Sequence, residues 1–297
     1  MDLAAYRGLI DLDRPFHHAA PPGSPAPDPG AVLELLAGDP AMARLGVTPG
    51  QARRVAGAGR GPARDLLRAM LTVRDPGPLP GAVVPLLDGL LAAERAGRPE
   101  VDAAALPGVG GGRPSAMALW RGDITTLRVD AIVNAANSGL LGCFRPGHPC
   151  IDNAIHSAAG PRLRDDCRAV VAAQGSPEPT GTAKITRGYH LPARYVLHTV
   201  GPVVDGEPGA GHEAALVSAY TSCLDLAAEV DDVRSVALCA VSTGVFGYPG
   251  LPAARTAVRT VTGWLAAHPG RLDRVVFDVW SADDRRFYQQ ALSEGPR

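Results

Sequence analysis

The sequence predicts an α/β protein: a three-layer α/β/α sandwich with a mixed central sheet, preceded by a small helical extension. Two patterns predict this fold. From residue 117 onward, short apolar runs typical of strands alternate with helix-length segments. In the first 115 residues, apolar residues instead recur at helical spacing. With 46% hydrophobic and 20% charged residues, the 297-residue chain has enough apolar material for a buried core.

The N-terminal part is expected to be a helical extension that ends in a Gly/Pro linker. A loop rich in Pro, Gly, Ser and Ala is expected at 21–29. Three helices are expected in the extension, at residues 31–36, 64–73 and 82–96. The sequence Val-Gly-Gly-Gly-Arg-Pro at 109–114 indicates a boundary, so the predicted domains are 1–115 and 116–297.

The second part is expected to alternate strands and helices. The expected strands are residues 117–121, 131–134, 195–200, 235–241 and 274–279. The expected helices are residues 155–173, beginning near Asp152, then 212–229 and 252–267. In sheets of this kind, ligands bind beyond the carboxyl ends of the strands. Residues that directly follow a strand are therefore the candidates for a binding site.

Composition and charge exclude several classes of protein. With 29 basic and 30 acidic side chains, the net charge of −1 provides no positive field for a nucleic-acid backbone. No apolar run is long enough to span a membrane, and no leader peptide is visible at the first residues. An odd count of five cysteines indicates a reducing compartment. The expectation is a cytoplasmic monomer with no nucleic-acid or membrane partner.

Two segments that follow strands have the chemistry of ligand-binding turns. The sequence STGVFGYP at 242–249 has glycines that allow close approach of backbone N–H groups to an anion, and a helix follows it. The side-chain amides of Asn134 and Asn137 can bind the hydroxyl groups of a sugar. Taken alone, the first segment is better explained as a plain glycine turn, and a pair of turn-forming asparagines is an alternative explanation of the second.

A third segment has the spacing of a metal site. Cys143, His148 and Cys150 bring two thiols and an imidazole into eight residues, a donor set that suits zinc. Three protein ligands with an open position are typical of a catalytic zinc. The alternatives are two incidental thiols beside a loop histidine, or a fourth ligand from elsewhere. The candidates for that ligand are His156, His190 and His198.

Several other polar residues have two interpretations each. Asp152 stands where a helix begins, so it is either the N-cap of that helix or a carboxylate that activates water. For His156 and His198 a buried, structural position is favoured. The remaining thiols fit the apolar side of helices or strands, as expected for Cys167, Cys223 and Cys239.

Four motifs in one order identify a resemblance. They are RGDIT at 121–125, VNAAN at 133–137, DNAIHSAAG at 152–160 and STGVFGYP at 242–249. Together they resemble the macrodomain, a fold that binds ADP-ribose. The segment from Cys143 to Cys150 stands where most hydrolytic macrodomains have a glycine-rich stretch. With the helical extension, it resembles the zinc-containing microbial macrodomains.

The resemblance implies roles for residues at these motifs. Asp123 would bind the adenine amino group, with Ile124 beside it, and Trp280 would stack on the adenine. Asn137, with Asn134, would face the distal ribose. The backbone N–H groups implied to hold the diphosphate are those of Ser242, Thr243, Gly244, Val245 and Phe246, and the Phe246 ring would pack on that ribose.

The resemblance also implies an activity: zinc-dependent hydrolysis that removes a single ADP-ribose from a modified, acidic side chain of a protein. Zn²⁺ held by Cys143, His148 and Cys150 would act on a ribose hydroxyl or a water and lower its pKa toward about 7. Asp152 would orient or deprotonate the nucleophile, and Asn137 would fix the ribose. Asn153 departs from the family, because many relatives have glycine at that position.

Two other functions fit the same motifs. A reader module would bind ADP-ribose without hydrolysing it, and it would need no open metal site. In a third possibility the zinc is structural, and Asp152 and water perform the hydrolysis. Besides the ADP-ribosylated protein itself, the resemblance implies a sirtuin-type ADP-ribosyltransferase and a lipoyl-carrier protein as partners.

Overall fold

The computed structural model describes residues 1–17, 25–109 and 116–294. Most of the expected linker at 109–114 and part of the expected loop at 21–29 lie outside these residues. The strands are β1 (Val101–Asp102), β2 (Met117–Arg121), β3 (Leu127–Arg128), β4 (Ala131–Ala135), β5 (Ala183–Arg187), β6 (Tyr195–Thr199), β7 (Ser235–Leu238) and β8 (Arg274–Val279). The helices are α1 (Pro29–Leu35), α2 (Pro40–Arg44), α3 (Pro49–Ala56), α4 (Arg60–Val73), α5 (Val83–Ala96), α6 (Ile151–Ala159), α7 (Pro161–Gln174), α8 (Ala210–Ala228), α9 (Gly250–Ala267) and α10 (Ala282–Glu294).

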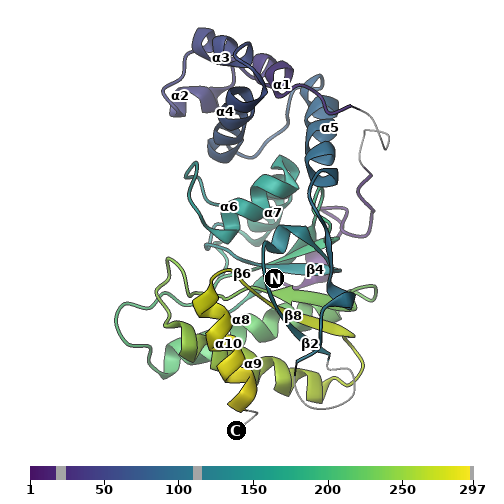
Figure 1. Ribbon diagram of the computed structural model, residues 1–297, viewed down its shortest axis with the longest axis vertical. Coiled ribbons are helices and arrows are strands. Elements are labelled where there is room, and N and C mark those ends of the chain that lie inside the picture. The colour runs from purple at the N-terminus through teal and green to yellow at the C-terminus, as the bar shows by residue number, and fades with distance from the viewer. Residues whose placement is uncertain (18–24, 110–115, 295–297) are drawn as a thin grey trace.

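A six-stranded mixed sheet forms the middle layer of the larger part of the molecule. Its strand order is β2-β8-β7-β4-β6-β5, and every neighbouring pair is parallel except β5 with β6. Helices α8, α9 and α10 lie on one side of this sheet, and α6 and α7 lie on the other (Figure 1). Because both faces are covered, β4 and β6 are apolar and buried along nearly their whole length. The predicted three-layer architecture is confirmed.

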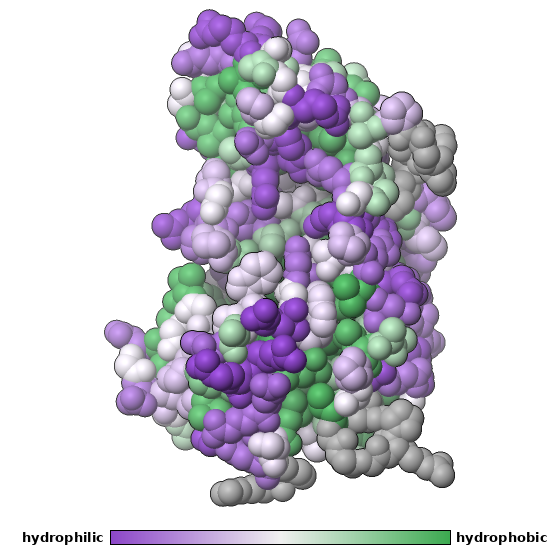
Figure 2. Space-filling model, in the orientation of Figure 1, coloured by the Kyte–Doolittle hydropathy of each residue, from purple (hydrophilic) through white to green (hydrophobic). Residues whose placement is uncertain are grey.

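The N-terminal helices α1 to α5 form a second, separate cluster. Their apolar side chains, such as Val32, Leu67 and Leu87, pack around one another. In Figure 1 this cluster lies beyond α6 and α7, on the far side from α9 and α10. Figure 2 shows hydrophobic residues gathered on these N-terminal helices, with a more hydrophilic band between them and the sheet domain. Among the described residues, no helix is long and apolar enough to cross a membrane.

The helical cluster is shorter than the expected extension of residues 1–115. Leu3, Tyr6 and Ile10 belong to the core around the main sheet. The Tyr6 hydroxyl accepts a hydrogen bond from the backbone N–H of Ile185 in β5, at 3.0 Å. On the other side of the cluster, β1 pairs in parallel with β3. The first residues and the segment after α5 therefore pack on the sheet domain.

The expected helix at 155–173 is wrong in one respect, because two helices occupy this region. α6 ends at Gly160, whose φ of 89° and ψ of 175° are not helical, and α7 begins at Pro161. A Cβ atom at Gly160 would lie 2.7 Å from Leu91 Cδ1, so glycine also permits the close approach of α5. The N-cap of α6 is Cys150 and not Asp152, which lies in the first turn.

Six of these helices and strands were not predicted from the sequence. They are α2, α3, α10, the short strands β1 and β3, and the edge strand β5. The first two begin with an N-cap residue followed by proline, Asp39-Pro40 and Thr48-Pro49, which is a recognisable signal for a helix start. β5 is short and contains a single large apolar residue, Ile185, so its sequence alternation is weak.

Candidate functional site

The candidate site lies where five parallel strands end. β2, β8, β7, β4 and β6 point the same way, so the segments that follow them meet at one edge of the sheet. Arg121, the last residue of β2, pairs with Val279 of β8. Asp123 and Trp280 therefore lie at the ends of adjacent strands. The Trp280 ring is 76% exposed, as an aromatic side chain must be to stack on a ligand.

Asp123 has a structural partner as well as a candidate ligand role. Its carboxylate accepts hydrogen bonds from the backbone N–H of Thr125 at 2.9 Å and from the Thr125 hydroxyl at 2.7 Å. It thereby caps the short 3-10 helix η3 (Ile124–Thr126), in which Ile124 is buried. This cap fixes the carboxylate at the sheet edge.

Sequence reasoning missed Asp278, an aspartate of β8 near Asp123. It is 6% exposed, and its Oδ1 has no hydrogen-bond partner among the described residues. Burial, together with the charge of Asp123, raises the pKa of Asp278 well above its ordinary value. The sequence offered no signal for it, because a single aspartate in an apolar strand has no motif of its own.

The loop after β7 presents backbone donors at the same edge. The N–H groups from Ser242 to Phe246 make no hydrogen bond within the described part of the chain. The loop is closed behind them, because Tyr248 N–H donates to the Ser242 carbonyl at 3.0 Å. Ser242 has a φ of 66°, a conformation that turns successive N–H groups toward one side. Unpaired backbone donors in a loop of this kind suit an anion.

Each remaining residue of this loop has a distinct position. Gly244 and Val245 are exposed, and Thr243 Oγ1 donates to the Ala240 carbonyl at 3.0 Å. The Phe246 ring packs against a small buried cluster that contains Ala136 and Leu140. This contact places the aromatic ring next to the segment that follows β4.

Two asparagines at the end of β4 differ in position. Asn134 is fully buried, and its Nδ2 donates to Asp152 Oδ1 at 2.8 Å and lies 3.2 Å from His198 Nδ1. Asn137 is exposed, and its Nδ2 lies 3.1 Å from the Gly142 carbonyl and 3.5 Å from Asp152 Oδ2. Asn137 is therefore accessible to a ligand, whereas Asn134 holds Asp152 in place from behind.

Asp152 is a buried carboxylate with unusual proton affinity. It lies in the first turn of α6 and is 5% exposed. Burial raises the pKa of Asp152 to about 6, and the hydrogen bond from Asn134 and the charge of Arg164 oppose this shift. A carboxylate with a pKa near neutrality can accept a proton from water and release it again.

Two buried histidines stand behind Asp152. His198 Nε2 lies 2.9 Å from Thr186 Oγ1, and burial lowers the pKa of His198 to about 3. His156 Nε2 lies 3.5 Å from Asp152 Oδ1, and neither ring nitrogen makes a hydrogen bond to a described residue. Burial also lowers the pKa of His156 well below its ordinary value. Both rings are therefore neutral, as the favoured structural interpretation requires, although His156 lacks the expected hydrogen bond.

The three candidate metal ligands do come together. The Sγ atoms of Cys143 and Cys150 and a ring nitrogen of His148 all lie within 4.8 Å of one another. Cys143 Sγ is 3.5 Å from His148 Nδ1. Burial, with the neighbouring Cys143, raises the pKa of the Cys150 thiol to about 11. Two thiols and an imidazole at this spacing fit zinc, whose charge would favour the thiolate forms.

None of the three candidates for a fourth ligand joins this group. His156 and His198 instead lie near the buried Cys167. His190 Nε2 lies 3.2 Å from Asp88 Oδ1 in α5. The candidate metal group thus consists of three side chains among the described residues. As expected, the three thiols outside it, Cys167, Cys223 and Cys239, are buried.

Hydrogen bonds connect the loop from Cys143 to Cys150, here called the metal loop, to α6. Cys150 Sγ accepts a hydrogen bond from the backbone N–H of Asn153 at 3.4 Å, so Cys150 caps the helix. Asn153 Nδ2 donates to the His148 carbonyl at 3.0 Å. Asn153 therefore supports the loop that carries the candidate metal ligands. Arg164 also reaches this loop, because its guanidinium lies 4.5 Å from the centre of the Phe144 ring.

Comparison with known proteins places these features in a family. The sequence profile named Macro domain matches residues 133–257. A Protein-ADP-ribose hydrolase of Treponema medium is 52% identical over 175 residues, which cover 59% of this chain and 66% of that protein. A Protein-ADP-ribose hydrolase of Staphylococcus aureus (strain MSSA476) is 48% identical over 176 residues, covering 59% and 65%.

A solved structure extends the match to three dimensions. The Trypanosoma brucei macrodomain in complex with ADP-ribose has a TM-score of 0.59 and 34% sequence identity, and the match covers 75% of this chain and 94% of that chain. By contrast, the chain spans just under two thirds of the two hydrolases, 66% and 65% of their lengths. The residues that the Macro domain profile matches include the ends of β4, β6 and β7. The chain belongs to the macrodomain family.

Proposed function

We propose that this protein is a hydrolase that removes single ADP-ribose groups from modified acidic side chains of proteins, with Zn²⁺ held by Cys143, His148 and Cys150. The observation that carries the proposal is the position of Asp152. This carboxylate, with a pKa of about 6, is two residues from the Cys150 thiol and is in contact with Asn134 and Asn137. The names of the two bacterial relatives support the same activity.

Different residues of the site bind different parts of ADP-ribose. Asp123, Ile124 and Trp280 take the adenine at the ends of β2 and β8. The unpaired N–H groups from Ser242 to Phe246 hold the diphosphate. The exposed Asn137 amide then binds the distal ribose beside Asp152, with the Phe246 ring packed at the same end.

Hydrolysis needs one water and one proton acceptor. The water oxygen adds to C1″ of the distal ribose, and the C1″–O bond to the modified side chain breaks. Its electron pair leaves with the side-chain carboxylate, and Asp152 takes the proton that the water loses. Asn134 holds Asp152 Oδ1, which leaves Oδ2 for this transfer. Zn²⁺ held by Cys143, His148 and Cys150 would supply Lewis-acid charge near Asp152.

A release assay tests the proposal. Protein stripped of metal with a chelator should not release ADP-ribose from an ADP-ribosylated protein, and added Zn²⁺ should restore release. Cys150→Ser is the sharpest variant, because serine preserves a helix N-cap but not a thiolate. We expect its release rate to fall at least about tenfold, with ADP-ribose affinity and melting temperature nearly unchanged.

The alternatives predict different results in this assay. Full release by the metal-free protein would assign the zinc a structural role only. Tight ADP-ribose binding without any release, at every zinc concentration, would identify a reader module and contradict the proposed hydrolysis. The assay can be repeated with the proposed partners. A sirtuin-type ADP-ribosyltransferase would attach ADP-ribose to a lipoyl-carrier protein, and this modified protein would then be the substrate.

A further inference from the structure

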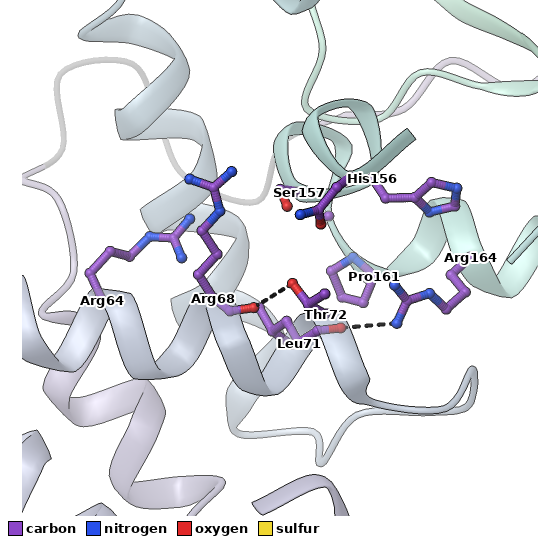
Figure 3. A pocket seen from close by; sticks show the side chains of 10 residues that line it. Arg64, Arg68, Leu71, Thr72, His156, Ser157, Pro161 and Arg164 are labelled. Atoms are coloured by element: carbon purple, nitrogen blue, oxygen red, sulfur yellow. Dashed lines mark hydrogen bonds between the residues drawn. The ribbon is translucent and has the colours of Figure 1, made fainter. Parts of the chain in front are cut away.

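A crevice separates the N-terminal helices from the sheet domain and does not belong to the ADP-ribose site. It is a small crevice that lies between α4 on one side and α6 and α7 on the other, and it opens to solvent (Figure 3). Its charged lining residues are Arg64, Arg68 and Arg164, and no acidic side chain lines it. Three guanidinium groups therefore line one narrow space, and one of them, that of Arg64, forms an ion pair with Glu94 of α5.

Two of these arginines have donors without acceptors. Arg64 Nη1 and Arg164 Nε are buried and make no hydrogen bond to any described residue. Arg164 as a whole is only 6% exposed, and burial lowers its pKa. A buried cationic donor without an acceptor is costly, so such groups in native proteins usually bind an ion or a water.

The other donors of these arginines hold them in place. Arg64 Nη2 donates to Glu94 Oε2 at 2.8 Å, and Arg64 Nε also bonds this carboxylate. Arg164 Nη1 donates to the carbonyls of Leu71 at 2.9 Å and Arg74 at 2.6 Å. Arg64 Nη1 and Arg164 Nε thus belong to guanidinium groups whose other nitrogen atoms are held in fixed positions. Preorganised donors of this kind bind a ligand with little loss of side-chain entropy.

We propose that this crevice binds a small oxyanion, a carboxylate or a phosphate. Arg164 of α7 and Arg64 of α4 provide donors from its two walls, and the exposed Arg68 of α4 adds a third guanidinium (Figure 3). Ser157 and Asn153 of α6 add polar groups to the lining. Guanidinium groups match both oxyanions in charge and in hydrogen-bond geometry.

An anion here would lie close to the residues that support the metal loop. Asn153 lines the crevice and also donates to the His148 carbonyl. Arg164 lines it and lies against Phe144 of the same loop. The oxyanion has two possible sources: free inorganic phosphate, or an acidic side chain near the modified residue of a protein substrate. The second source rests on the proposed hydrolase function.

The first arm of the test measures inorganic phosphate binding by calorimetry. The full-length, zinc-loaded protein is saturated with ADP-ribose, so that the diphosphate loop is occupied. Arg68→Glu is the test variant because Arg68 is exposed on α4, and Arg53→Glu, an exposed arginine on α3, is its matched control. We expect phosphate affinity to fall roughly tenfold or more in the first variant and less than about twofold in the second.

The second arm measures hydrolysis of two ADP-ribosylated peptides, one with glutamates and one with glutamines beside the modified residue. An acidic side chain as the ligand predicts that Arg68→Glu raises KM for the glutamate peptide alone, with kcat unchanged. Either positive arm supports the oxyanion site and identifies its source. If phosphate does not bind and the two peptides respond alike, the proposal is overturned. Phosphate binding by a protein that releases no ADP-ribose would contradict the proposed hydrolase but leave this site intact.

Discussion

Asp152 is held from behind by a chain of buried polar groups. Its Oδ1 accepts from Asn134, whose amide also lies 3.2 Å from His198 Nδ1, and His198 Nε2 meets Thr186. Because His198 is neutral, it can accept the amide hydrogen at Nδ1 while donating from Nε2. The chain fixes the orientation of Asn134, and Asn134 in turn fixes Asp152.

Replacement of His198 tests this arrangement. His198→Leu should lower the free energy of unfolding by about 2–4 kcal/mol, because the buried Asn134 amide and the buried Thr186 hydroxyl each lose one hydrogen-bond partner. We also expect slower release of ADP-ribose, since Asn134 is free to turn. His198→Asn, which keeps an acceptor near Asn134, should lose less of both. Urea unfolding and release rates measure the two effects, and equal losses in the two variants would argue against a positioning role.

A second aspartate makes stability depend on pH. Burial raises the pKa of Asp166 to about 6 from an ordinary value of 3.8, although Tyr189 and Arg187 oppose the shift. The folded protein thus binds a proton that the unfolded chain has lost between pH 4 and 6. The contribution of Asp166 to the free energy of unfolding therefore falls as pH rises through that window, by roughly 2–3 kcal/mol in total.

The Asp166→Asn variant lacks this titration. Relative to the wild type, its free energy of unfolding should improve by roughly 2 kcal/mol between pH 4 and pH 7. Urea unfolding of both proteins across this range measures the difference. A difference that does not change with pH would mean that Asp166 keeps an ordinary pKa in the folded protein.

At the residue scale, the sequence predicted those site residues whose partners are near in the chain. Cys143, His148 and Cys150 share one short loop, so their spacing alone indicates that they meet. Asp278 and Arg164 could not be found in this way. The roles of both come from contacts with distant segments, Asp123 for the first and the end of α4 for the second.

At the scale of elements, the break between α6 and α7 determines how the N-terminal helices approach. Gly160→Ala should destabilise the protein by about 2–3 kcal/mol, because alanine disfavours its backbone conformation and its Cβ would meet Leu91. The matched control is Gly175→Ala, at a φ of 72° with open space around it. It should cost about 1 kcal/mol. Urea unfolding compares the two, and equal costs would show that the contact with Leu91 does not matter.

The elements that the sequence predicted well are the strongly apolar ones. The central strands and the long helices α8 and α9 lie close to their expected positions. The single helix expected at 155–173 was wrong because periodicity continues across Gly160, and only the backbone turn at that residue separates α6 from α7. Local signals in Gly-Pro at 160–161 could have indicated the break.

At the scale of the whole molecule, Asp88 joins the helical cluster to the sheet domain. Its carboxylate accepts two hydrogen bonds from Arg162, at 2.6 and 2.9 Å, and lies 3.2 Å from His190 Nε2. Arg162 and His190 both belong to the sheet domain, whereas Asp88 lies in α5. This contact therefore attaches α5 to the sheet domain.

Removal of the Asp88 carboxylate should weaken the contact between the helical cluster and the sheet domain. Asp88→Ala should lower the free energy of unfolding by roughly 2–3 kcal/mol, because it leaves a half-buried arginine unpaired. Asp13→Ala, which removes an exposed ion pair with Arg7, should cost less than about 1 kcal/mol. Urea unfolding and limited proteolysis measure the change. Equal stability of the two variants would mean that Asp88 does not hold the helical cluster in place.

The docking of the helical cluster was beyond sequence analysis. The cluster itself was predicted from helical periodicity, but its boundary was drawn too widely, since residues at both of its ends pack on the main sheet. These packing contacts involve single apolar side chains such as Tyr6 and Leu106. They carry no pattern that distinguishes a neighbour within the cluster from one in the sheet domain.

The most direct test of the proposed activity compares Asp152→Asn with the wild type. Both zinc-loaded proteins are mixed in excess with an ADP-ribosylated protein, and released ADP-ribose is followed through a single turnover. We expect the variant to release it about 10²–10⁴ times more slowly, while ADP-ribose affinity, measured by calorimetry, changes less than about threefold. Release by the variant at the wild-type rate would contradict the account, because Asp152 would then not take part in the reaction.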